Sequence, residues 1–296
     1  MPFGDFRRAH GVGMEGHYWR FACGESSIAV IAGVCRDWAM ITLAAEPGGF
    51  ARTTVAPVVR HDRGIEAGDV LVAGFDGVRV RLDADAWLDV SSRERRDWPR
   101  RAWGALGPAH VVPGLGQYWS PWLLGGRVSG AAVVGGRSIS LDGASVYAEK
   151  NWGAAFAPHW WWGQAWLSPE SGVAFAGGRL PVGAPTAVVA WSPAGLVRLA
   201  PPFARTVAGA GAGAWHVHAA SPRWTVELEG EAVSEPLRLP VPIPAERRLE
   251  LRSEHHLRGR LQVVVRRGRR VWLRGESVLA GLEEGRPPGD AGELRR

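Results

Sequence analysis

The sequence predicts an all-β protein, built from two tandem antiparallel β-barrel domains with little helix. Short apolar runs such as "SIAVIAGV", "TAVVAW" and "RLQVVVRR" are bounded by turn residues throughout the chain, a pattern that is typical of strands. The 296 residues include 40 glycines and 21 prolines, which favour many turns over long helices. An internal repeat indicates that one set of strands occurs twice.

Two local patterns refine this prediction. The stretch "FDGVRVRL" (75–82) places Asp-Gly between two apolar runs, which is a strong hairpin signal. The segment "SSRERRDWPRRAWGAL" (91–106) is the one stretch that favours a helix, and Pro99 is expected to break it.

The repeat relates "GGRSISLDGASVYAE" (135–149) to "RGRRVWLRGESVLAG" (267–281), with seven identical residues at a constant spacing of 132 positions. A looser pair joins 19–34 to 162–179, because both run from an aromatic strand through a polar turn to an apolar strand. Duplication of one domain explains both pairs.

The repeat predicts two domains of about 140 residues each, over 1–150 and 151–285. The tail, 286–296, is polar and rich in Pro and Gly, which favours disorder. Because opening and closing strands recur in the same order, each domain is expected to be an up-and-down meander closed into a barrel. Residues 145–149 should form the last strand of the first domain, with a linker over 150–160.

The formal net charge is +6, and arginine carries almost all the positive charge. This balance permits contact with an anionic surface or substrate. No apolar run follows the charged N-terminal residues, so no signal peptide is expected, and no stretch reaches the roughly 18 apolar residues of a membrane span. Cys23 and Cys35 are too few for a disulfide framework. We therefore expect free thiols in a soluble, cytoplasmic protein that can contact a membrane surface peripherally.

The stretch "VYAEKNWG" (146–153) holds the only lysine and the only asparagine of the chain, Lys150 and Asn151. It falls at the predicted junction between the domains, a common place for ligand clefts. Successive side chains of a strand point to opposite faces. Tyr147 and Glu149 should therefore share one face while Lys150 points to the other.

Four stretches of the chain together carry a family resemblance. "YAEKNWGAAFAPHWWWGQAW" (147–166) contains an A-E-K-N-W-G core followed by a W-x-W-x-Q strand. "MEGHYWRFA" (14–22) is similar to an early E-G-x-Y-Y-R strand, 256–285 to a C-terminal segment, and 116–130 matches more loosely. These features resemble the tocopherol cyclase family. Residues 45–110 show no match.

The resemblance implies two lipocalin-like (calycin-type) barrels, as in the related carotenoid hydratase and hydroxyneurosporene synthase group. It also implies a prenylated quinol as substrate. The family protonates a trisubstituted alkene, and the ring hydroxyl traps the tertiary cation to close a chroman ring. No redox cofactor is consumed, so none is expected. A non-catalytic carrier of a quinone or another apolar lipid is the alternative hypothesis.

Such a reaction needs a proton donor in a water-poor pocket. Glu149 is the first candidate, because burial at a domain junction would raise the pKa of its carboxyl group. Glu15 is the second candidate and Asp142 the third. Tyr147 shares the face of Glu149 and would polarise the quinol oxygen.

The remaining polar residues of the motif have two possible roles. Asn151 and Gln164 would bind the quinol oxygen, beside Lys150. Alternatively, the motif is a structural clamp, in which Lys150 forms a salt bridge across the domain interface and Asn151 satisfies loop backbone. The candidate catalytic residues are thus Glu149, Tyr147, Glu15, Lys150 and Asn151.

Tryptophans are the expected substrate-binding residues, because indole faces attract a developing cation. In a strand, Trp160 and Trp162 share one face and Trp161 takes the other. The alternative is that these large side chains fill the cores of the barrels. The expected substrate-binding set is Trp152, Trp160, Trp162, Gln164, Trp19, Trp119 and Trp122.

The histidine pair and the arginine-rich segment do not identify a further site. His216 and His218 alternate on one strand, but no third ligand stands at a telling spacing, so no metal is expected. The arginines of 92–103 suit a membrane surface or a solvated loop. No recognition fold supports nucleic-acid binding, so the expected partner is an apolar small molecule.

Overall fold

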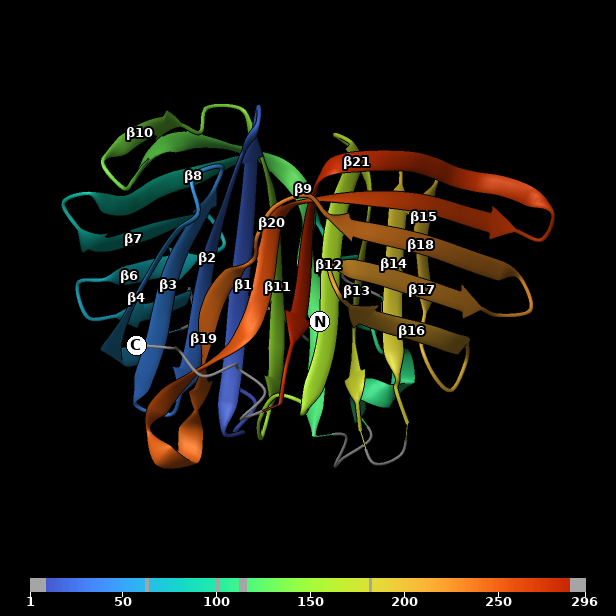
Figure 1. The fold of residues 1–296 in the computed structure, drawn as a ribbon, viewed down its shortest axis with the longest axis horizontal. Coiled ribbons are helices and arrows are strands. Elements are labelled where there is room, and N and C mark those ends of the chain that lie inside the picture. Colours follow the sequence, from blue (N-terminus) through green and yellow to red (C-terminus); the bar gives the residue numbers. More distant parts are fainter. Residues whose placement is uncertain (1–8, 62–63, 100–101, 112–115, 181–182, 288–296) are drawn as a thin grey trace. The chain divides into compact units, whose positions relative to one another are not determined.

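The computed structural model describes residues 9–61, 64–99, 102–111, 116–180 and 183–287. Within these residues the chain forms twenty-one β-strands and two short 3-10 helices, η1 (Gly107–Val111) and η2 (Pro244–Glu246). The fold is therefore all-β, as the sequence predicts (Figure 1). None of the described helical segments has the length or apolar character of a membrane span.

The first eleven strands form one antiparallel sheet. Its order is β9-β11-β1-β2-β3-β4-β5-β6-β7-β8, and a further pairing of β8 with β9 closes a ten-stranded barrel, while β10 extends the sheet from β9. These strands are β1 (Met14–Cys23), β2 (Ser26–Cys35), β3 (Trp38–Glu46), β4 (Phe50–His61), β5 (Gly64–Ala67), β6 (Leu71–Gly74), β7 (Gly77–Asp83), β8 (Ala86–Asp97), β9 (Gln117–Val134), β10 (Arg137–Ser140) and β11 (Ala144–Gly153).

The remaining strands form a second antiparallel sheet, in the order β15-β14-β13-β12-β21-β20-β18-β17-β16, with β19 paired to β20. This second barrel is nearly closed, with β15 and β16 as its end strands. The strands are β12 (His159–Ser168), β13 (Ser171–Arg179), β14 (Thr186–Ser192), β15 (Gly195–Leu199), β16 (Arg205–Gly211), β17 (Ala214–Ala220), β18 (Trp224–Ala232), β19 (Leu237–Ile243), β20 (Arg248–Arg267) and β21 (Arg270–Gly285).

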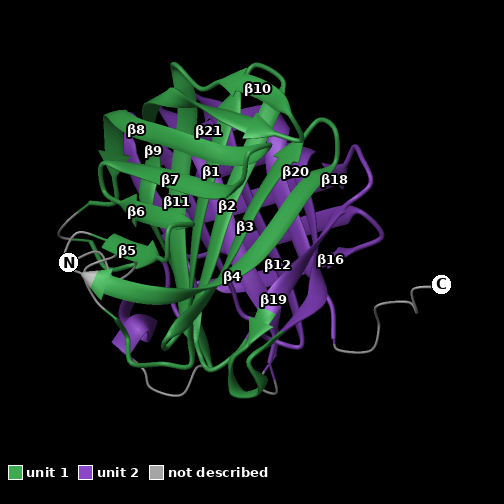
Figure 2. Cartoon of the chain, turned by 90° about the vertical axis from the view of Figure 1, so that its left-hand side faces the viewer, with its two compact units in different colours: residues 1–104, 114–155, 242–248 green, residues 105–113, 156–241, 249–296 purple. Residues whose placement is uncertain are grey.

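The chain divides into two compact units that follow these barrels (Figure 2). The first unit comprises 1–104, 114–155 and 242–248, and the second comprises 105–113, 156–241 and 249–296. Most of the tail that the sequence expects to be disordered, from residue 288 onward, lies outside the described residues.

The internal repeat corresponds to equivalent strands. In the first unit β1 pairs with the closing strand β11 and with β2. In the second unit β12 pairs with the closing strand β21 and with β13. Each unit is thus a meander whose first and last strands meet, as the repeat predicts.

Each barrel encloses a packed apolar core. In the first, Trp19 and Phe21 of β1 meet Val146 and Ala148 of β11 in one buried cluster. In the second, Trp161 of β12 belongs to the corresponding cluster. Burying a large apolar side chain contributes about 1.5–3 kcal/mol. These clusters also identify the inward face of each strand, because alternate residues point the same way.

Two local predictions are wrong. Residues 91–97 belong to strand β8 rather than to a helix, because β8 pairs with β9 as far as Asp97 and thereby closes the barrel; long-range pairing overrides local helix propensity. Residues 150–153 are not linker. Strand β11 continues to Gly153, held by β1 on one side and β9 on the other. Both cysteines are free thiols.

Candidate functional site

Strand β11 carries the lysine–asparagine motif in the middle of a sheet. Its register places Lys150 opposite His17 of β1 and Glu149 opposite Tyr18. Lys150 follows the inward positions of Val146 and Ala148, which lie in the barrel core. Tyr147 and Glu149 therefore lie on the outward face, and the predicted sidedness of the motif is confirmed.

Inside the first barrel, Lys150 forms a buried ion pair with Glu15. The Lys150 Nζ atom lies 2.8 Å from Glu15 Oε2, with side-chain exposures of 0% and 4%. Arg60 Nη2 lies 2.5 Å from the same carboxylate oxygen, and the backbone N–H of His10 donates to Glu15 Oε1. Thus β1, β4 and β11 meet at one carboxylate. The structural-clamp hypothesis predicts a salt bridge from Lys150, and this is confirmed. The hypothesis is wrong that the bridge crosses the domain interface, because Glu15 lies in the same unit as Lys150.

The charges of this cluster fix its protonation. Burial alone would raise the pKa of Glu15, but the hydrogen bond from His10 and the charges of Lys150 and Arg60 hold it well below its usual range. Burial, followed by the same two cations, lowers the pKa of His17 well below its usual value. Glu15 is therefore a carboxylate at neutral pH, which disfavours it as a proton donor, and His17 is neutral.

Trp152 forms the aromatic wall of the inner cluster. Its indole stacks on His10 at 4.1 Å between ring centres and on Tyr118 at 5.6 Å. Lys150 Nζ lies 5.9 Å from the centre of the Trp152 ring. Trp19 lies on the same inward side, with its ring 6.0 Å from that of His17. Because cations contact aromatic faces favourably, Trp152 supports the lysine.

The outward face of β11 holds a different pair. The Tyr147 hydroxyl donates a 2.6 Å hydrogen bond to Glu149 Oε2. Burial, and then the charge of Glu149, raises the pKa of Tyr147 well above its usual value, so the phenol keeps its proton. Glu149 is 3% exposed.

Asn151 and Trp119 lie opposite each other on β11 and β9. Side chains of directly paired residues share one face, so both lie on the face of Glu149. Among the described residues, neither Asn151 Oδ1 nor Trp119 Nε1 has a hydrogen-bond partner, although both atoms are buried. The Asn151 amide lies over Gly16, where a Cβ would collide with it. The pair therefore presents one acceptor, Asn151 Oδ1, and one donor, Trp119 Nε1.

The third candidate acid lies elsewhere. Asp142 is exposed in the turn between β10 and β11, and its Oδ1 accepts a 3.1 Å hydrogen bond from the Gly130 N–H. A solvated carboxylate does not provide a water-poor acid. Trp122 belongs to the core of the first barrel, and its ring meets Phe75 edge-on at 5.7 Å.

The second unit contains the other predicted residues. Trp161 lies in the barrel core, so Trp160, Trp162 and Gln164 share the outward face of β12, as the alternation predicts. Trp160 Nε1 donates a 2.9 Å hydrogen bond to Glu283, and Gln164 is fully buried. Trp160 also belongs to a small buried apolar cluster with Ala157 and Val241, so the core-packing alternative holds for this tryptophan.

Glu283 is a half-buried acid that the sequence patterns do not reveal. Its Oε1 also accepts from Ser253 at 2.9 Å, and Oε2 lies 3.4 Å from His255 Nδ1. Burial would raise the pKa of Glu283, but the hydrogen bond and charge of His255, with those from Trp160 and Ser253, lower it overall. The ring of Trp162 lies 5.6 Å from that of His255. Strand β21 brings these residues together, because it pairs with β12 on one side and with β20 on the other.

Arg20 is a second residue that composition does not single out. It lies opposite Tyr147 on β1 and is fully buried. Burial lowers its pKa to about 10, against the opposing effects of Tyr18 and Glu46. Arg20 belongs to the 14–22 stretch, which is the one signal that could have identified it. Within the described residues, no group of three or more His, Cys, Asp or Glu side chains is arranged to hold a metal ion.

Comparison with known proteins gives two matches. The family model described as "Tocopherol cyclase-like" matches residues 117–286, more than half of the chain. Among solved structures, a putative AttH from Nitrosomonas europaea is similar with a TM-score of 0.56 and 14% sequence identity, over 95% of this chain and 94% of that chain. At this identity the likeness concerns the fold. No curated protein matches the sequence.

Proposed function

Because the chain belongs to the tocopherol cyclase-like family, we propose that it catalyses the acid-promoted addition of a hydroxyl group to an isoprenoid alkene. Cyclisation of a prenylated hydroquinone to a chromanol is the intramolecular form of this reaction, and hydration is the intermolecular form. The activity rests on one face of β11 and β9, which carries Glu149, Tyr147, Asn151 and Trp119.

Elimination supports Glu149 as the acid. Glu15 is ionised by its hydrogen bond from His10 and by two cations, and Asp142 is exposed. Glu149 is buried, and its Oε2 accepts a hydrogen bond from the Tyr147 hydroxyl group, which holds the carboxyl group in place. A general acid held this way typically contributes about 10²–10⁴-fold to a rate.

The observation that carries the proposal is the pair of buried polar atoms beside this acid. Asn151 Oδ1 is an acceptor and Trp119 Nε1 is a donor, and neither is bonded to a described residue. A buried polar atom without a partner costs about 1–3 kcal/mol. A hydroquinone hydroxyl donates and accepts at once, so it would satisfy both atoms.

The proposed step balances without a cofactor. Glu149, in its protonated form, transfers a proton to the less substituted alkene carbon, and positive charge develops on the tertiary carbon. The face of the Trp119 indole stabilises that charge by about 2 kcal/mol when water is excluded. The substrate hydroxyl then forms the C–O bond and loses its proton to the Glu149 carboxylate. The acid is regenerated, and the product is an isomer or a hydrate of the substrate.

The test is product formation. Purified protein is incubated with a prenylated hydroquinone under anaerobic conditions, and chromanol or hydrated product is measured by liquid chromatography and mass spectrometry. We expect product that increases with enzyme concentration. A protein that retains a stoichiometric, unreacted lipid in native mass spectrometry, and forms no product from any isoprenoid quinol, would instead be a carrier.

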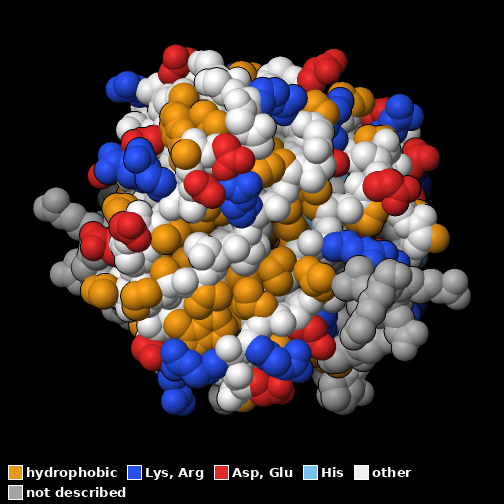
Figure 3. Space-filling view, turned by 60° about the vertical axis from the view of Figure 1, so that its left-hand side comes forward, with side chains coloured by type: hydrophobic (Ala, Val, Ile, Leu, Met, Phe, Trp, Pro, Cys, Tyr) orange, Lys and Arg blue, Asp and Glu red, His pale blue; other side chains and the backbone are white. Residues whose placement is uncertain are grey.

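We further propose that the substrate is collected at an anionic lipid surface. Strands β4 and β6 of the first unit expose Val55, Val59 and Val72, and apolar side chains lie between charged ones on the face shown in Figure 3. Apolar side chains beside arginines suit a negatively charged interface. In a flotation assay, the protein should move to the top fraction together with phosphatidylglycerol vesicles. A smaller share of a Val55→Ser/Val59→Ser variant should be found in that fraction. Equal binding of both proteins would contradict this proposal.

A further inference from the structure

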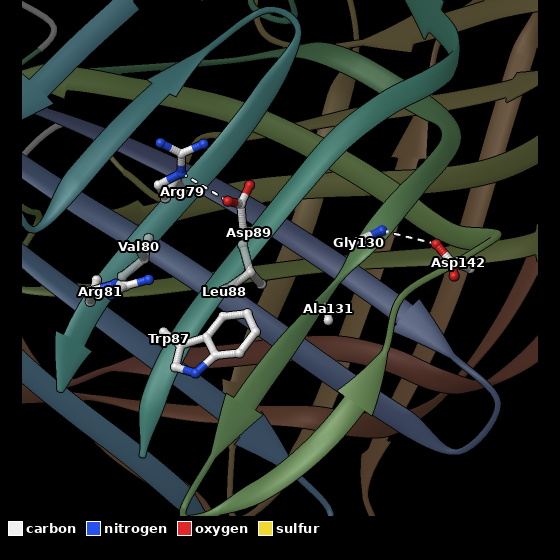
Figure 4. Close-up of a pocket in the computed structure, with 9 residues that line it drawn as sticks. All are labelled: Arg79, Val80, Arg81, Trp87, Leu88, Asp89, Gly130, Ala131 and Asp142. Carbon is white, nitrogen blue, oxygen red and sulfur yellow. Dashed lines mark hydrogen bonds and ion pairs between the residues drawn. The ribbon is translucent and has the colours of Figure 1, made fainter. Parts of the chain in front are cut away.

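A depression of about 500 Å³ lies on the outer surface of the first barrel and shares no residue with the site proposed for catalysis. Its charged and aromatic side chains come from three places: Arg79 and Arg81 of β7, Trp87 and Asp89 of β8, and Asp142 of the β10–β11 turn (Figure 4). This volume lies within the range of small-molecule sites, about 300–1,000 Å³.

Two small residues of β9 keep the depression open. Gly130 and Ala131 form the side that faces Asp89 and Asp142. A Cβ at position 130 would overlap the Asp89 carbonyl oxygen, and its φ of +143° disfavours any other residue. The backbone N–H of Gly130 is bonded to Asp142 Oδ1 at 3.1 Å, which fixes that carboxylate at the rim.

The charges around the depression balance. Arg79 Nε lies 2.9 Å from Asp89 Oδ2, while Arg81 forms no ion pair with any described residue. Two guanidinium groups therefore stand with two carboxylates. A cation would be repelled by the two arginines and an anion by the two aspartates, so a ligand without net charge is favoured.

Trp87 supplies the one aromatic surface. Its side chain is half-buried, and it lies opposite Arg81 of β7. In Figure 4 the indole projects from β8 into the depression, beside Ala131. The ring provides a flat apolar wall. The carboxylates around it accept hydrogen bonds and the guanidinium groups donate them.

We infer that this groove binds a neutral saccharide. A pyranose ring has an apolar C–H face that stacks on an indole. Its hydroxyl groups each donate and accept hydrogen bonds, so they match mixed carboxylate and guanidinium side chains. An aliphatic lipid would cover Arg81, which forms no ion pair with a described residue, without offering its guanidinium group a hydrogen-bond acceptor. The inference is independent of the proposed reaction, because it uses a different face of the barrel.

Saturation-transfer NMR and calorimetry with three neutral probes test this inference: cellotriose, maltotriose and triacetylchitotriose. We expect at least one to bind with a Kd of about 1 mM or tighter. Phosphocholine and inorganic phosphate serve as charged probes and should not compete. The inference is overturned if no trisaccharide binds at about 10 mM, or if a charged probe binds and displaces the sugar.

Variants then place the site. Trp87→Ala should weaken binding about tenfold, because it removes the stacking surface. Ala131→Leu fills the groove without removing any packing, and should weaken binding even if Trp87→Ala folds poorly. Trp103→Ala is the matched control, since Trp103 is 44% exposed and lies outside the groove. Saccharide binding that survives both groove variants would assign the sugar to another surface and refute the inference.

Discussion

Lys150 Nζ lies 2.8 Å from Glu15 Oε2 inside the first barrel, and both side chains are almost wholly buried. The lysine is therefore part of an internal charge cluster that ties β11 to β1, with Arg60 adding β4. The catalytic proposal concerns the opposite face of β11, where Tyr147 binds Glu149. Under the proposed function, structural and chemical roles are divided between the two faces of one strand.

Substitution of Lys150 by methionine should destabilise the protein strongly. The change leaves the Glu15 carboxylate buried with one cation fewer, and breaking a buried pair typically costs about 3–5 kcal/mol. Urea unfolding measures the effect. The control is Arg266→Met, which removes an exposed pair with Glu227 and should cost less than about 1 kcal/mol. Equal losses in the two variants would show that the Lys150 pair is no more important than a surface pair.

The neutral state of His17 predicts a dependence of stability on pH. Its pKa is lowered in the folded protein, first by burial and then by Lys150 and Arg60. Below about pH 6.5 the unfolded chain binds a proton that the folded protein does not. The free energy of unfolding should therefore fall with decreasing pH, by up to about 1.4 kcal/mol per pH unit.

A His17→Gln variant isolates this contribution. Urea unfolding of wild type and variant between pH 5 and 7.5 should give a flatter curve for the variant. The other histidines are present in both proteins and cancel in the comparison. Parallel curves would mean that His17 takes up its proton equally well in the folded state.

Replacement of Glu149 by glutamine should abolish most of the proposed activity. The amide keeps an oxygen for the Tyr147 hydroxyl but has no acidic proton, so kcat should fall about 10²–10⁴-fold. The melting temperature checks that the fold is retained. Glu276→Gln is the matched control, because it makes the same chemical change at an exposed pair with Arg260. An active Glu149→Gln enzyme would remove this residue from the acid role.

Substitution of Trp119 by phenylalanine tests the binding of the substrate oxygen. The ring remains, but the buried N–H that has no described partner is lost. We expect kcat/KM to fall about tenfold, the value of one hydrogen bond of about 1.4 kcal/mol. Trp152→Phe provides the comparison, because Trp152 lies on the inward face, stacked on His10. That variant should lose stability with little change in kcat/KM, and the reverse pattern would move the site into the barrel.

The sequence was sufficient for every feature that depends on local periodicity. Alternation along a strand placed Tyr147 and Glu149 on one face and Lys150 on the other, and it separated Trp161 from Trp160 and Trp162 in the same way. The repeat also indicated which late strand pairs with the first strand of each unit, since equivalent segments must pair equivalently. These deductions need only a period of two residues and a conserved order of strands along the chain.

Only the tertiary structure decided which residues meet across strands. Glu15 and Lys150 pair because β1 and β11 are neighbours in one particular register, and Trp160 reaches Glu283 across 123 positions of sequence. Residues 91–97 of the helix expected over 91–106 instead belong to strand β8, because its pairing with β9 closes the barrel. Register and closure are set by packing of the whole core. Local sequence therefore fixes the face of each side chain, whereas the folded barrel selects its partner.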